Sequence, residues 1–147
     1  MRIMVVDDSR TALATLRVKL EEMRYQVVPF DSGQAAWDHL QAADERLIIT
    51  DWMMPQLDGL ELCRRIRARG LDPYVYVIML TSKPLRMDHL AGLEAGADDF
   101  LVKPVDTCEL AIALARARRF LGAQALLHGR IQELERRAID PAPVFAT

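Results

Sequence analysis

Short runs of apolar residues alternate along the chain with longer stretches in which apolar positions recur at helical spacing. The apolar runs cover residues 3–6, 27–30, 47–50, 74–80 and 100–102. The stretches with helical spacing cover residues 9–23, 32–43, 59–69, 87–95 and 106–137. Strands that alternate with helices need crossover connections, so the pattern predicts a parallel sheet that is covered by helices on both faces.

Pro29 helps to order the predicted strands. A proline cannot donate a hydrogen bond to a neighbouring strand, which favours an edge position for the strand at residues 27–30. If the strand at residues 3–6 lies inside the sheet, the order is 2-1-3-4-5, as in a flavodoxin-like doubly wound fold. Ligands bind to such sheets outside the carboxyl ends of the strands, where the strand order reverses.

The last predicted helix is longer than a helix that only covers a sheet. At 1.5 Å per residue, residues 106–137 would extend about 45–50 Å. A stripe suited to packing on the sheet comprises Leu110, Leu114, Ala117 and Leu121. A second stripe has the alternating spacing of a coiled coil and comprises Phe120, Gln124, Leu127, Ile131, Leu134 and Ala138. We therefore expect a compact domain over residues 1–121 and a helical extension with a frayed tail over residues 122–147. The extension would be a dimerisation helix or a linker, and a solvated tail is the alternative.

The composition excludes several classes of protein. Of the 147 residues, 51% are hydrophobic and 27% are charged, which is the balance of a globular domain. The net charge of -2 does not favour a broad nucleic-acid-binding face, and no apolar run approaches the about 20 residues that span a bilayer. The apolar part of the N-terminus is too short for a secretory signal. We expect Cys63 and Cys108 to be reduced and packed in a cytoplasmic protein that binds no membrane and no nucleic acid directly.

Polar residues follow four of the five predicted strands directly, at their carboxyl ends. They are Asp7 and Asp8, Asp51, Thr81 and Lys103. Three carboxylates in one crevice repel one another, and a divalent cation that binds their oxygens removes this repulsion. Mg²⁺ suits such a site because it binds only a few protein oxygens and keeps waters or phosphate oxygens as its other ligands. A carboxylate beside Mg²⁺ and a lysine can attack a phosphoryl group and become an aspartyl phosphate, to which a threonine hydroxyl can donate a hydrogen bond.

These residues lie in motifs that resemble the receiver domain of two-component response regulators. The motifs are residues 5–9 (VVDDS), 50–55 (TDWMMP) with 58–59 (DG), 80–82 (LTS) and 96–104 (GADDFLVKP). The resemblance extends over residues 1–121. It is specific because separate elements match in order and spacing, although any one of them alone would be a weak signal.

The resemblance implies roles for the acidic residues. Asp51 would be the phosphoacceptor, and Asp8 would bind Mg²⁺ directly together with Asp51. Asp7 would act on the metal through water, and the backbone carbonyl of Met53 would be a further ligand.

The resemblance also implies a switch. Thr81 and Lys103 would contact the phosphoryl group, and Thr81 would move toward it while Phe100 rotates inward. The peptide bond between Lys103 and Pro104 is expected to be cis. Two flanking residues would tune the lifetime of the phosphoryl group: Met53 and Lys83.

The sequence thus predicts a switch that accepts a phosphoryl group on Asp51 from a sensor histidine kinase or a phosphotransfer protein. Phosphorylation would alter the surface of the fourth helix, fifth strand and fifth helix and so control an output domain or a partner. At most slow self-dephosphorylation is expected, so the protein would not be an enzyme. One alternative is a phosphorylation-independent interaction module. Another is a hydrolase that uses an aspartyl phosphate, but Met53 stands where such enzymes need a second carboxylate. The residues after Ala138 are too few for an output domain, so a stand-alone regulator or part of a longer protein is expected.

Overall fold

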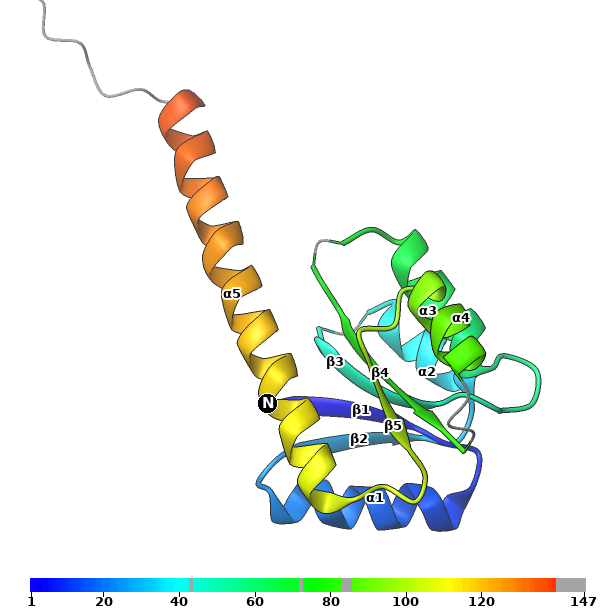
Figure 1. Ribbon diagram of the computed structural model, residues 1–147. Helices are drawn as coiled ribbons and strands as arrows, with labels where there is room; N and C mark the ends of the chain where they lie inside the picture. Colours follow the sequence, from blue (N-terminus) through cyan, green and yellow to red (C-terminus); the bar gives the residue numbers. More distant parts are fainter. Residues whose placement is uncertain (43, 72, 83–85, 140–147) are drawn as a thin grey trace, which may run out of the picture.

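A computed structural model describes residues 1–42, 44–71, 73–82 and 86–139 of the chain, with the backbone alone for residues 86–88. Five parallel strands form one sheet in the order β2-β1-β3-β4-β5, as the sequence predicted (Figure 1). The strands are β1 (Arg2–Val6), β2 (Gln26–Phe30), β3 (Leu47–Asp51), β4 (Tyr76–Thr81) and β5 (Asp99–Val102). The flavodoxin-like fold class is therefore confirmed.

Helices cover both faces of the sheet (Figure 1). They are α1 (Arg10–Glu22), α2 (Gly33–Leu40), α3 (Gly59–Ala68), α4 (Arg86–Ala95) and α5 (Thr107–Ile139). Helices α1 and α5 pack on one face, and α2 and α3 pack on the other, where Ala97 after α4 joins the same apolar cluster. The ends of the helices differ from the predicted bounds by at most three residues, and the largest difference is at α2, which ends at Leu40 rather than at residue 43.

Burial follows the strand order. All residues of β3 and β4 are buried, whereas β2 is half-buried or exposed because it lies at the edge. Pro29 pairs with Val5 in β1 and has no strand on its other side. The sheet therefore places the carboxyl ends of β1 and β3 side by side in its interior, and this is where the polar residues gather.

Helix α5 continues well beyond the sheet (Figure 1). Its 33 residues extend about 50 Å. Leu110, Leu114 and Ala117 are buried on the sheet, as predicted, and Ala113 joins them. Leu127, Ile131 and Leu134, in the second predicted stripe, are 46–60% exposed.

Two expectations about individual side chains were wrong. Phe120 was assigned to the coiled-coil stripe, but its ring lies 4.9 Å from that of Tyr74 and 5.6 Å from that of Tyr76, so it packs on the compact domain. Cys63 is buried as expected, whereas Cys108 in the first turn of α5 is exposed.

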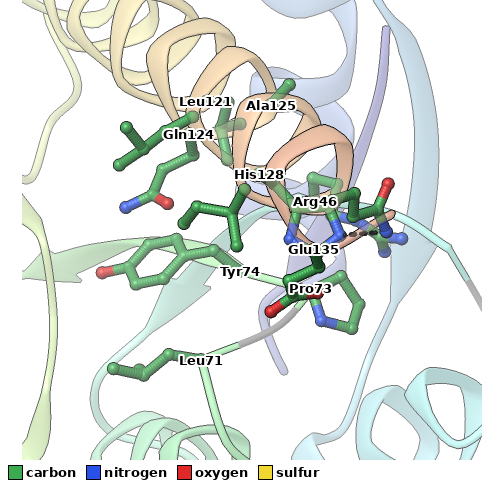
Figure 2. A pocket seen from close by; sticks show the side chains of 12 residues that line it. Arg46, Leu71, Pro73, Tyr74, Leu121, Gln124, Ala125, His128 and Glu135 are labelled. Carbon is green, nitrogen blue, oxygen red and sulfur yellow. Dashed lines mark hydrogen bonds between the residues drawn. The ribbon is translucent and has the colours of Figure 1, made fainter. Parts of the chain in front are cut away.

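A groove of about 810 Å³ lies between the extension of α5 and the residues that precede the amino-terminal ends of β3 and β4. Figure 2 shows Gln124 and His128 of α5 facing Tyr74 and Pro73, which precede β4. The stripe residues Leu127 and Ile131 also line this groove. The groove lies at the opposite end of the strands from the polar residues described next.

Candidate functional site

Three carboxylates meet at the carboxyl ends of β1 and β3. Asp7 directly follows β1, Asp8 is next to it, and Asp51 is the last residue of β3. One carboxylate oxygen of each residue lies within 4.8 Å of the others. Asp7 and Asp51 are buried, whereas Asp8 is exposed at the mouth of the site. Two oxygens bound to one Mg²⁺ at about 2.1 Å can be at most about 4.2 Å apart, so small side-chain rotations bring these oxygens onto one ion.

Lys103 supplies the positive charge of the site. Its Nζ atom donates a hydrogen bond to Oδ2 of Asp7 at 2.8 Å and lies 3.2 Å from Oδ2 of Asp51. Lys103 directly follows β5, which is an edge strand of the sheet. The Lys103–Pro104 peptide bond is cis. One ammonium group thus links the carboxyl ends of β1, β3 and β5.

The crevice disfavours the ionised form of Asp51 although Lys103 is next to it. Burial raises the pKa of Asp51, the charge of Asp7 raises it further, and the ammonium of Lys103 offsets only part of this. Burial alone would lower the pKa of Lys103, but its hydrogen bond to Asp7 and the charge of Asp51 raise it on balance. A hard divalent cation held by carboxylate oxygens would relieve the remaining repulsion.

Local interactions fix the side chain of Asp7 and the start of α3 next to Asp51. The backbone N–H of Ser9 donates to Oδ1 of Asp7 at 2.9 Å, which leaves the other oxygen for Lys103. Asp58 caps α3 by accepting from the N–H of Glu61. A Cβ atom on Gly59 would come within 2.1 Å of the carbonyl oxygen of Asp51, so the first residue of α3 must be glycine for the helix to approach the site this closely.

Of the predicted switch residues, Thr81 lies at the same end of the sheet as the carboxylates, and Phe100 lies within β5. Thr81 is the buried last residue of β4, and its carbonyl oxygen accepts a hydrogen bond from the N–H of Lys103 at 2.8 Å. Phe100 in β5 pairs with Met79 and packs on the apolar cluster below α3. The side chain of Met53 is exposed in the loop after Asp51, and Lys83 lies outside the described residues.

Some contacts of the motif were not foreseen from the sequence. Asp98 lies in the motif at residues 96–104 but was given no role. Its carboxylate accepts hydrogen bonds from Arg67, from the hydroxyl of Tyr74 and from the N–H of Val77. This network holds α3, β4 and the loop before β5 together. No periodicity signals it, because its members are far apart in the chain.

A family model described as the response regulator receiver domain matches residues 3–115. The chain therefore belongs to the receiver-domain family of response regulators. A phosphorylation-independent module of the same fold is not favoured, because the acidic set of the family is complete.

Individual relatives give the same picture. The response regulator MprA of Mycobacterium avium is 41% identical over 121 residues, which are 82% of this chain and 51% of that protein. A putative response regulator from Chloroflexus aurantiacus has a TM-score of 0.74 at 31% identity and covers 79% of this chain and 95% of its own. The chemotaxis protein CheY4 of Vibrio cholerae has a TM-score of 0.73 at 28% identity, and the match covers 79% of this chain and 97% of the CheY4 chain. The chain spans about half the length of the curated relatives it matches.

In the described part of the chain, no helix combines the length and the apolar character that are needed to cross a membrane.

Proposed function

We propose that Asp51 accepts a phosphoryl group from a phosphohistidine of a sensor histidine kinase or a phosphotransfer protein. The observation that supports this most directly is the convergence of three carboxylates and the Lys103 ammonium in one crevice. An oxygen of Asp51 attacks phosphorus, the P–O bond forms, and the P–N bond to the imidazole breaks. Asp51 must be deprotonated to attack, and Lys103 favours this form.

The residues present fit a Mg²⁺ site. Asp8 and Asp51 would bind the ion directly, Asp7 through water, and the carbonyl of Met53 would add a further oxygen. Bound Mg²⁺ supplies positive charge next to the oxygens of the transferred phosphoryl group. Lys103 would balance the same charge from the other side, since it already lies between Asp7 and Asp51.

Phosphorylation would act as a switch. The new phosphoryl oxygens accept a hydrogen bond from Thr81, and Phe100 occupies the inward position that this movement leaves open. The surface of α4, β5 and α5 then changes its preferred partner or output domain. Met53, exposed beside Asp51, would obstruct attacking water, and Lys83 would tune the lifetime of the phosphoryl group.

The wider role is that of a regulator rather than an enzyme. We propose at most slow self-dephosphorylation, and the absence of a carboxylate at Met53 supports this. We propose action in the cytoplasm, in keeping with the two free cysteines, and through protein partners rather than direct contact with nucleic acid or membrane.

We propose a division between a receiver domain over residues 1–121 and a helical extension over residues 122–147. A second copy of the chain would pair with the extension, because Leu127, Ile131 and Leu134 are exposed at heptad spacing.

Intact mass spectrometry tests the phosphoacceptor role. The wild-type protein, incubated with Mg²⁺ and acetyl phosphate, should gain the mass of one phosphoryl group, and Asp51→Asn should gain none. No gain on the wild type would favour the interaction module. Multiple turnover of a generic phosphate ester that survives Asp51→Asn would instead indicate a hydrolase.

A further inference from the structure

The ring of Phe100 is held on one side by His89 of α4. The two rings are nearly parallel, at 5°, and their centroids are 4.8 Å apart, which is an offset-stacked pair. His89 and Gly92 are three residues apart, so they lie on the same face of α4. A Cβ atom on Gly92 would come within 2.5 Å of the Phe100 ring, so that ring lies directly on the backbone of the helix.

Trp52 borders the same aromatic ring and directly follows the phosphoacceptor residue. The ring centroids of Trp52 and Phe100 are 6.4 Å apart, and both side chains pack on the apolar cluster that includes Met79. Phe100 is therefore partly buried and faces this cluster, between α4 and the loop after β3, and we call this placement of the ring inward. The chain of contacts runs from Asp51 through Trp52 and Phe100 to His89.

The face of the His89 ring is in contact with Phe100, whereas one of its polar atoms makes no hydrogen bond. Its Nε2 atom is buried and has no hydrogen-bond partner among the residues that the structure describes. A buried ring nitrogen without a partner is unfavourable, so the packing of the ring must outweigh this cost. A phenylalanine in the same place would keep the stack and remove the cost.

We propose that His89 is a positioning residue for the switch: its stack on Phe100 holds that ring inward and so favours the state in which Asp51 is phosphorylated. This inference rests on the proposed function. Phe100 has no hydroxyl that could anchor it by a hydrogen bond, so the faces of its neighbours alone determine its position. By linkage, any contact that favours the inward ring also strengthens binding of a phosphoryl group or its mimic at Asp51.

Beryllium fluoride with Mg²⁺ is the probe, because it mimics the phosphoryl group on an aspartate, and Trp52 fluorescence reports the titration. His89→Ala should bind the probe about twofold to tenfold more weakly than the wild type, which is the range expected for loss of one aromatic pair. His89→Phe should bind it at least as tightly as the wild type. Glu94→Ala, at an exposed position of the same helix, should match the wild type.

The outcomes separate this inference from the function on which it rests. Equal affinity of His89→Ala and the wild type would overturn the role of His89, and so would a loss in His89→Phe as large as that in His89→Ala. A wild-type protein that binds no probe and gains no phosphoryl mass would instead contradict the proposed function. Thermal unfolding without the probe shows whether each variant is folded. If His89→Ala does not fold, weaker binding by His89→Phe than by the wild type would still overturn the role of His89.

Discussion

Replacement of Lys103 by methionine removes the only cation among the described residues that contacts Asp7 and Asp51 together. Breaking a fully buried ion pair by removing one partner costs about 3–5 kcal/mol. The Lys103 side chain is 26% exposed, so water screens part of this interaction, and we expect a loss of about 2–3 kcal/mol without Mg²⁺. With a urea slope of about 2 kcal/mol per molar, the midpoint of unfolding should fall by about 1–1.5 M.

Urea unfolding at pH 7, followed by circular dichroism with and without Mg²⁺, measures this effect. Mg²⁺ should raise the midpoint more in Lys103→Met than in the wild type, because the metal then neutralises carboxylates that no ammonium faces. Lys19→Met is the matched control: the Lys19 ammonium donates to the carbonyl of Val105, not to a carboxylate, so its loss should cost about 1 kcal/mol. An unchanged midpoint for Lys103→Met without Mg²⁺ would refute the electrostatic account of the site.

Three further predictions concern other parts of the molecule. The net pKa of buried Glu45 is below its ordinary value of 4.5: burial raises it, but the hydrogen bond from His39 and nearby cations outweigh burial. The ionised form of Glu45 therefore contributes stability above pH 4.5, and this contribution is lost as the pH falls through the lowered pKa. In urea titrations, Glu45→Gln should cost about 1–2 kcal/mol at pH 7 and little in acid. Equal losses at both pH values would contradict this. Gly59→Ala should cost about 3 kcal/mol and slow phosphorylation from acetyl phosphate, because its methyl group meets the Asp51 carbonyl; wild-type stability would disprove the close approach. Ile131→Gln should weaken a dimer at least about tenfold in sedimentation, and identical monomers for both proteins would rule out pairing through α5.

The sheet could be predicted from the sequence because its signals are local. Continuous apolar runs mark buried parallel strands, and Pro29 marks the edge, so the strand order and the gathering of Asp7 and Asp51 at one edge follow. Residues far apart in the chain cannot be paired in this way. The approach of Gly59 to the Asp51 carbonyl and the stack of His89 on Phe100 depend on how helices lie on the sheet, which periodicity does not specify.

The boundary between domain and extension shows the same limit. Two apolar stripes overlap near the middle of α5, and the sequence alone assigned Phe120 to the outer one. Tyr74 was expected inside a strand, but it lies before β4, where its hydroxyl donates to Asp98 and its ring contacts Phe120. Phe120 therefore packs on the compact domain because a side chain from a distant loop offers it an aromatic surface.

The position of the phosphoryl group is the most direct test of the proposed site. After reaction with acetyl phosphate, borohydride reduction of the acyl phosphate and peptide mass mapping locate the modified aspartate. We predict modification at Asp51 that requires Mg²⁺ and is largely lost in Asp8→Asn, which removes the exposed ligand but leaves the nucleophile. Modification of a different aspartate, or equal modification of Asp51 in the presence of a metal chelator, would contradict the metal-assisted phosphoacceptor site.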